Sequence, residues 1–128
     1  MAPMLPRLFF LHFEGTSFIA EVEGELAGFL CGFLSQTHPD EAYVHFLGVD
    51  PERRGQGIGH ALYARFFEAV HPLGRTVVRA VTSPGNVGSV EFHRRMGFEV
   101  ERVAENYDGL GGDRVLLVKR LDLGPTAQ

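Results

Sequence analysis

The chain has 128 residues, of which 45% are hydrophobic and 22% charged, a composition typical of a single globular domain. Twelve basic and 16 acidic residues give a formal net charge of -4, which argues against binding to nucleic acid or to a membrane surface. The one cysteine, Cys31, has no partner for an internal disulfide, so the cysteine usage fits the reducing cytoplasm.

The first residues predict neither a membrane anchor nor a signal peptide. The apolar stretch at residues 8–13 is interrupted by His12 and is far shorter than the roughly 20 residues of a membrane-spanning helix. No small-residue cleavage site follows it. We therefore expect one domain over residues 1–128, with 122–128 as a loose tail.

Three strands are predicted next along the chain. Residues 18–22 carry apolar side chains at alternate positions, residues 26–34 are almost continuously apolar, and Glu-Gly-Glu lies between them. This pattern predicts a β-hairpin. After a polar loop, residues 42–49 return to a strand pattern that ends at Asp50-Pro51.

Helical periodicity begins at Ile58 and continues to Val70, which predicts a helix of about three turns. The remaining predicted elements are a strand at 76–82, a helix at 87–96 ended by Gly97, and strands at 98–103 and 114–121. The order β-β-β-α-β-α-β-β predicts an α/β (α+β) fold in which helices pack on a mixed sheet. Its central β-α-β unit predicts one parallel strand pair.

A glycine-rich segment joins the third strand to the first helix. Gly55, Gly57 and Gly59 stand at alternate positions there, directly after Arg53 and Arg54. Glycines let the backbone approach a ligand, and the free amides of a helix N-terminus bind anions such as a pyrophosphate. The sequence lacks the Gly-Lys-Ser/Thr of a P-loop and the glycine spacing of a dinucleotide fold. A simple flexible turn is the alternative interpretation.

Two motifs in this order resemble the GNAT superfamily of acyl-CoA-dependent N-acyltransferases. Arg54, Gly57 and Gly59 match its signature Arg/Gln-x-x-Gly-x-Gly/Ala, and residues 47–51 look like the strand that leads into it. Residues 86–98 are similar to the second motif of the family, an asparagine followed by a short helix that ends in Gly-Phe. The resemblance covers about residues 18–121 and implies the fold of that family.

The resemblance also implies where acetyl-CoA, as co-substrate, would bind. The pantetheine arm would lie in a V-shaped opening between the strands at 42–49 and 76–82. The backbone of Leu47, Gly48 and Val49 would pair with the pantetheine amides, and Asn86 would bind the cofactor arm. The residues around the pyrophosphate would be Arg53, Arg54, Gly55, Gln56, Gly57, Ile58, Gly59 and His60.

His93 is the candidate catalytic acid. In the family, the second helix usually offers a tyrosine that protonates the departing CoA sulfur, and His93 occupies that position. A histidine with a pKa of about 6.5 could give up a proton at neutral pH. His93 lies two helical turns from Asn86, so both would share a face toward the cofactor. A packed histidine on a half-buried helix is the equally weighted alternative.

His45 is the candidate base, because it lies in the strand beside the proposed opening. Strict alternation would put it on one face with Tyr43, Leu47 and Val49. The alternative is a partly exposed strand histidine. Weaker candidates, acting through water, are Glu41 and His38.

The remaining histidines, the cysteine and two aspartates give weaker support for a catalytic or binding role. The six histidines have no metal-ligand spacing, so no metal is expected, and Cys31 has no histidine near it in sequence for an acyl-cysteine route. The loop at 107–113 falls where the family often shapes its acceptor pocket. Asp108 and Asp113 could hold a cationic amine there, or they could simply form the turn.

Two functions of different class follow from the resemblance. One is transfer of an acetyl group from acetyl-CoA to a primary amine of a small molecule or peptide, by direct attack in a ternary complex. The other is a catalytically weak or inactive acyl-CoA-binding sensor. The first strand and two helices usual in the family would have to fit into residues 1–17. Either the domain is reduced at its start, or a neighbouring subunit covers the exposed sheet edge and face, or the start codon is misplaced. A homodimer that covers apolar residues 8–10 is a further hypothesis.

Overall fold

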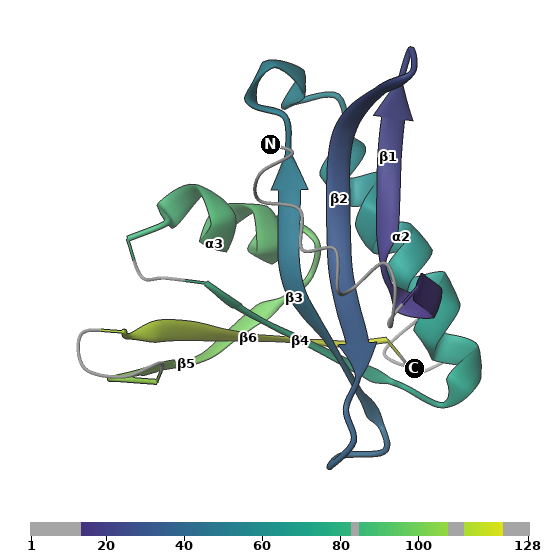
Figure 1. The fold of residues 1–128 in the computed structure, drawn as a ribbon. Helices are drawn as coiled ribbons and strands as arrows, with labels where there is room; N and C mark the ends of the chain where they lie inside the picture. Colours follow the sequence, from purple (N-terminus) through teal and green to yellow (C-terminus); the bar gives the residue numbers. More distant parts are fainter. Residues whose placement is uncertain (1–13, 83–84, 108–111, 122–128) are drawn as a thin grey trace.

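The computed structural model describes residues 14–82, 85–107 and 112–121, and within them a six-stranded sheet has the order β1-β2-β3-β4-β6-β5 (Figure 1). The strands are β1 (Phe18–Val22), β2 (Glu25–Leu34), β3 (Glu41–Val49), β4 (Val77–Thr82), β5 (Glu99–Ala104) and β6 (Arg114–Arg120). The helices are α2 (Ile58–Val70) and α3 (Val87–Arg95), with 3-10 turns η2 (Glu14–Thr16), η3 (Pro51–Arg53) and η4 (His71–Leu73).

The predicted elements and the mixed α/β class are confirmed, and each predicted boundary differs from the observed one by at most one residue. The turn between β1 and β2 places Glu23 and Gly24 at φ 53° and 81°, the left-handed pair that a two-residue hairpin requires. The end of α3 is also as predicted. Gly97 has φ 96°, and the N–H of Phe98 donates to the carbonyl of His93 at 3.0 Å.

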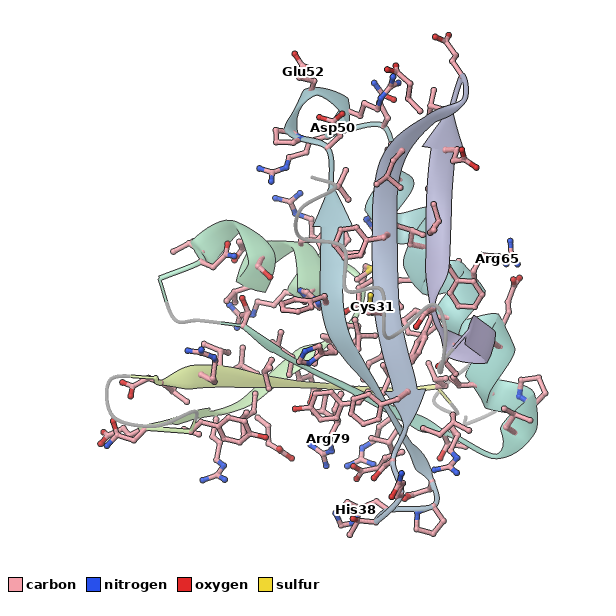
Figure 2. The ribbon with its side chains drawn as sticks, in the orientation of Figure 1. Cys31, His38, Asp50, Glu52, Arg65 and Arg79 are labelled. Carbon is pink, nitrogen blue, oxygen red and sulfur yellow. The ribbon has the colours of Figure 1, made fainter. Side chains whose placement is uncertain are left out.

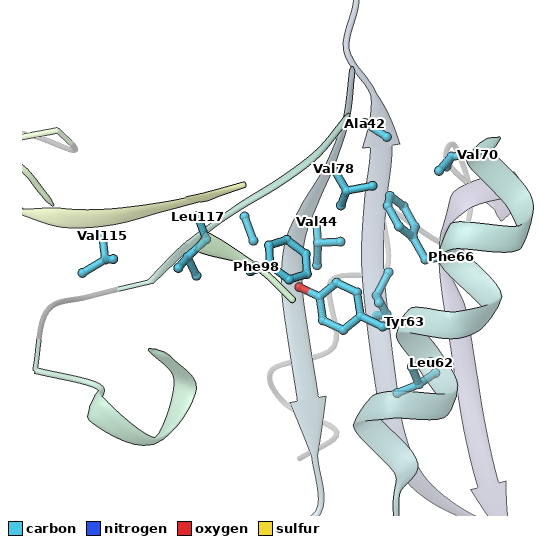
Figure 3. Packing of buried hydrophobic residues seen from close by; sticks show 12 residues of the cluster. Ala42, Val44, Leu62, Tyr63, Phe66, Val70, Val78, Phe98, Val115 and Leu117 are labelled. Atoms are coloured by element: carbon cyan, nitrogen blue, oxygen red, sulfur yellow. The ribbon is translucent and has the colours of Figure 1, made fainter. Parts of the chain in front are cut away.

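The helix α2 covers one face of the sheet. Its buried side chains recur every three or four residues, and Figure 3 shows Leu62, Tyr63, Phe66 and Val70 directed at the strands. Across from them, the core is completed by sheet residues and by Phe98. No helix in the described ranges is long and apolar enough to cross a membrane.

The sheet divides between β3 and β4. These strands pair in parallel only from Glu41 opposite Val77 to Val44 opposite Ala80. Beyond that point β3 continues to Val49 and stays paired with β2, whereas the end of β4 pairs with β6. Figure 1 shows the two strands diverging. This divergence is the V-shaped opening that the resemblance implied.

A β-bulge in β3 corrects one prediction. Cys31 of β2 lies opposite Phe46 and Gly32 lies opposite Val44, which leaves His45 as the extra residue. The bulge shifts the alternation of side chains between the two sheet faces by one residue. Leu47 therefore packs on the core, and Phe46 is 45% exposed. The prediction that His45 shares a face with Leu47 is therefore wrong.

Candidate functional site

Two of the three glycines, Gly55 and Gly57, lie in the loop before α2 and have a backbone that favours glycine. Gly55 has φ 87° and Gly57 has φ 79°, in the left-handed region. A Cβ atom built at either position would meet nothing within 4 Å. The loop therefore offers open space directly beside its own backbone.

Gly59 is required to be a glycine for a different reason, which is helix packing. A Cβ atom on Gly59 would lie 2.8 Å from Cζ of Phe92, so the missing side chain lets α2 and α3 approach each other. His60 also contacts α3, with its ring edge-on to Phe92 at 5.3 Å between centroids. The sequence pattern assigned all three glycines to the phosphate-binding segment, but in the structure Gly59 allows the close packing of the two helices.

The N-terminus of α2 opens into the same loop. Gly57 is its N-cap and has no side chain to cap with, and the first bond across the helix start runs from the N–H of Ala61 to the carbonyl of Gly57 at 2.9 Å. The preceding amides, those of Ile58, Gly59 and His60, cannot bond within the helix. With the positive end of the helix dipole, they form a donor set for an anion.

Positive side chains stand on the exposed approach to this loop. Arg53 forms a surface ion pair with Glu25 at 3.4 Å, and such pairs are weak enough to exchange for a ligand. Arg54 and Gln56 are exposed. Asp50 caps η3 by accepting the N–H of Glu52 at 3.1 Å, and Figure 2 shows both acids at this end of β3.

The edge of β3 that faces the opening is unpaired by any described strand beyond Val44. Its backbone groups there are available to an extended ligand in the manner of an added strand. Packing against β2 requires a glycine at position 48, because a Cβ atom there would lie 2.6 Å from the ring of Phe29. Leu47, Gly48 and Val49 thus have backbone groups along the opening, whereas the side chains of Leu47 and Val49 lie on the faces of the sheet.

His93 is buried in an aromatic cluster, with 5% of its surface exposed. Its Nδ1 lies 2.8 Å from the carbonyl oxygen of Ser89, and its Nε2 lies 2.7 Å from the hydroxyl of Tyr63. Because a carbonyl only accepts, Nδ1 carries the proton and Nε2 accepts from Tyr63. The rings of Phe92 and Phe98 pack edge-on against the imidazole.

Burial keeps this pair neutral. It lowers the pKa of His93, although the hydrogen bond to the Ser89 carbonyl acts in the opposite direction, and it raises the pKa of Tyr63. Both ring nitrogens of His93 are committed inside the protein. This geometry favours the packed-histidine interpretation, and its role as the acid stays a prediction.

The side chains of Asn86 and His93 lie in different environments, one exposed and one buried. Asn86 is exposed, and its side-chain oxygen accepts the N–H of Ser89 at 3.1 Å as the N-cap of α3. His93 lies two turns further along and points into the core. The geometry therefore does not bring the two side chains together, and a shared face toward the cofactor stays a prediction.

The other candidates separate in space. His45 is exposed at the bulge and its ring lies 4.4 Å from that of Phe46. Asp113 accepts the N–H of Asn106 at 2.8 Å, which is a turn-forming role, and Asp108 lies outside the described residues. So do residues 8–10, on which the homodimer hypothesis depends.

A charged cluster that the sequence did not reveal lies on the sheet face opposite α2. Arg79 of β4 binds Glu41 at 2.9 Å and Glu101 at 2.8 Å. Burial alone would lower the pKa of Arg79, but the hydrogen bonds and charges of the two carboxylates more than offset it, so the pKa is raised. Glu41 is therefore held by Arg79, which weakens it as a candidate base.

Among the described residues, no three histidines, cysteines or acids gather into a group that could hold a metal ion. Cys31 is buried, and burial raises the pKa of its thiol to about 12. The thiol is therefore protonated at neutral pH and a poor nucleophile.

Residues 2–98 match the model of the acetyltransferase (GNAT) family. The chain is similar to an L-2,4-diaminobutyric acid acetyltransferase of Nocardia farcinica, with 38% identity over 70% of this chain and 49% of the relative. It is also similar to an uncharacterized N-acetyltransferase of Methanocaldococcus jannaschii, with 36% identity over 73% of this chain and 43% of the relative. The chain thus spans about half the length of these curated relatives.

Among solved structures, Chaetomium thermophilum Naa20 in complex with a bisubstrate analogue superimposes with a TM-score of 0.79. The match covers 90% of this chain and 70% of that one at 21% identity, so it bears on the fold alone.

Proposed function

The chain belongs to the acetyltransferase (GNAT) family, and from this premise we propose that it is an N-acetyltransferase that moves an acetyl group from acetyl-CoA to a primary amine. The observation that carries the proposal is the opening between β3 and β4, with the glycine loop of α2 at one end of β3. The acceptor is a small molecule or a peptide.

The residues present fit acetyl-CoA. The open space beside Gly55 and Gly57 and the outward amides of Ile58, Gly59 and His60 suit its pyrophosphate, with Arg53, Arg54 and Gln56 around it. The unpaired edge of β3 at Leu47, Gly48 and Val49 suits the amides of its pantetheine arm, and the exposed Asn86 at the start of α3 is proposed as a further contact of that arm.

Chemistry in this site depends mainly on alignment. Acetyl-CoA supplies a thioester: the amine nitrogen bonds to its carbonyl carbon, the C–S bond breaks, and the thiolate takes up a proton while the nitrogen loses one. The chain holds the thioester at the fork, the point where β3 and β4 stop pairing and the opening between them begins, and brings the amine to it. This alignment by itself supplies a large rate gain.

His45 is the proposed base, because it is exposed and directly follows Val44, the last residue of β3 paired with β4. His45→Gln should lower kcat by about tenfold or more. An unchanged kcat would remove His45 from the reaction. For His93, the buried neutral ring supports a positioning role, in which it ties α3 to Tyr63 of α2.

Two wider proposals accompany this function. The single buried cysteine fits a cytoplasmic location. A homodimer is proposed because apolar residues stay exposed on both edge strands, Ile19 of β1 at 48% and Val103 of β5 at 53%. Light scattering at high concentration should then give twice the chain mass, and a monomer would contradict the dimer.

The proposed activity is tested by release of free CoA thiol from acetyl-CoA across a library of primary amines, with mass detection of the acetylated product. We expect release that depends on the amine and yields one acetylated amine per thiol. Tight acetyl-CoA binding without release for any amine would overturn the proposal and favour the CoA-binding sensor.

A further inference from the structure

A cavity of about 430 Å³ opens on the sheet face opposite α2, a volume typical of a small-molecule site. Residues of the loop after β2, of four strands and of their connections line it. They are Ser35, His38, Glu41, Tyr43, Arg79, Ala80, Arg102, Tyr107, Leu116 and Leu117. The proposed function so far assigns no role to this cavity.

The position of the cavity relates it to the opening between β3 and β4. Ala80, which lines the cavity, is also the last residue of β4 that pairs with β3. The glycine loop lies at the far end of β3, and Figure 2 shows His38 and Arg79 at the end opposite to Asp50 and Glu52. A thioester on an arm that runs along β3 from the loop would therefore arrive at the fork beside this cavity.

Of the two arginines that line the cavity, Arg79 forms ion pairs with carboxylates of the described residues and Arg102 does not. Arg79 is held by Glu41 and Glu101 at 2.9 and 2.8 Å. Arg102 is exposed, lines the cavity, and makes no hydrogen bond or ion pair within the described part of the chain. Its guanidinium is therefore available to a ligand.

A bulge in β5 explains why the sequence neighbours Glu101 and Arg102 both act on the sheet face that carries Arg79 and the cavity. Val100 lies opposite Leu117 and Arg102 opposite Leu116, so Glu101 is an extra residue. The bulge re-aims the side chains of Glu101 and Arg102 relative to strict alternation. Glu101 consequently reaches Arg79, and Arg102 lines the same cavity.

The chemistry of Arg102 selects one class of ligand. A guanidinium binds a carboxylate through two parallel hydrogen bonds, a geometry that an amine lacking a carboxylate does not use. Arg102, Leu116 and Val81 lie in one row across β5, β6 and β4, so Arg102 is about 10 Å from the β4 side of the fork. The arginine side chain spans part of that distance and a small ligand the rest.

From this arrangement we infer that the acceptor is a free amino acid, whose carboxylate binds Arg102 and whose amine points to the fork between β3 and β4. The inference rests on the proposed acetyltransferase function and names the substrate class of that site. Glu41 and Glu101 together carry one negative charge more than Arg79, which both of them bind, and this excess favours the approach of the amine as a cation before it loses a proton.

The test compares amino acids with the amines left when their carboxylate is removed. CoA thiol release is measured with L-lysine against cadaverine, L-ornithine against putrescine, and L-phenylalanine against phenethylamine. For the pair that is turned over best, we expect kcat/KM at least about tenfold higher for the amino acid, because a charged bidentate contact contributes on the order of 1.5 to 3 kcal/mol.

Arg102→Gln should abolish that preference by raising KM for the amino acid with little change in kcat, and Arg102→Lys should restore part of it. The matched control is Arg120→Gln, an exposed arginine of β6 outside the cavity, which should keep the preference. Circular dichroism establishes that each variant is folded.

The outcomes separate the two claims. Turnover of amines with no preference for a carboxylate, or a preference that survives in Arg102→Gln, overturns the inference and leaves the acetyltransferase standing. No turnover of any member of the three pairs, with turnover of another amine of the library, also overturns the inference alone. No amine-dependent release across the whole library overturns the proposed function, and the inference falls with it.

Discussion

At the residue scale, the least expected feature is the polar pair inside the aromatic core. Tyr63 and His93 are thirty residues apart in sequence, yet the tyrosine hydroxyl lies 2.7 Å from Nε2 of the histidine. The Ser89 carbonyl completes the chain of hydrogen bonds at 2.8 Å. A buried pair of this kind is stable only while every member is satisfied.

A double-mutant cycle measures this pair. Tyr63→Phe and His93→Leu should each lower the free energy of unfolding by about 1 to 3 kcal/mol, because each leaves a buried polar atom unpaired. The double variant should lose less than the sum of the two by about 1 kcal/mol or more, as urea denaturation would show. Additive losses would mean that the two groups do not interact.

The same pair predicts a pH dependence of stability. The folded state lowers the pKa of His93 below its ordinary value of 6.5, so the unfolded chain binds more protons as the pH falls. The contribution of His93 is present above about pH 6.5 and is lost as the pH falls toward its folded pKa. Between about pH 7.5 and pH 5, the wild type should lose more stability than Tyr63→Phe/His93→Leu, and parallel pH profiles would contradict the buried neutral histidine.

Single residues were also where prediction from sequence was weakest. The alternating pattern misassigned the face of His45, because one extra residue in β3 carries no signal in the sequence. The ion pairs of Arg79 with Glu41 and Glu101 join three strands, and only the sheet order brings them together. Contacts of this kind depend on register, which hydrophobic periodicity does not specify.

At the scale of elements, prediction from sequence succeeded because each helix and strand carries its own local signals. The apolar spacing of α2 and the glycine after α3 fix those helices by short-range physics. The three 3-10 turns were not predicted, because three residues contain too little pattern to read. The glycine loop was identified, but the separate reasons for its glycines needed neighbours from α3.

Those separate reasons can be measured with alanine variants. Gly57→Ala should cost about 1 to 2 kcal/mol of stability for a left-handed backbone and should weaken acetyl-CoA binding, because the loop can no longer keep its shape. Gly59→Ala should cost about 1 to 3 kcal/mol by pressing Cβ on Phe92.

The control is Gly15→Ala, where a Cβ atom meets nothing within 4 Å, and it should change stability by less than about 0.5 kcal/mol. Thermal unfolding and titration calorimetry with acetyl-CoA supply both readouts. If Gly57→Ala bound acetyl-CoA as tightly as the wild type, the loop would not be the phosphate site.

At the scale of the whole molecule, β3 organises the proposed site. One of its ends leads into the glycine loop, its bulge and last pairing with β4 lie in the middle, and the charged cavity adjoins its other end. The fold thus brings the proposed pyrophosphate site, the proposed path of the pantetheine arm and the proposed acceptor cavity into one line. The order of these parts follows from the topology, whereas the cavity itself was visible only in the structure.

Amide hydrogen exchange with and without acetyl-CoA tests this layout most directly. We expect new protection in two segments, at residues 55–60 of the loop and first turn of α2 and at residues 47–49 of the open β3 edge. The edge strand β1 should stay unchanged and serves as the internal control. Saturating acetyl-CoA that left both segments unprotected, or protected only residues elsewhere, would contradict the account.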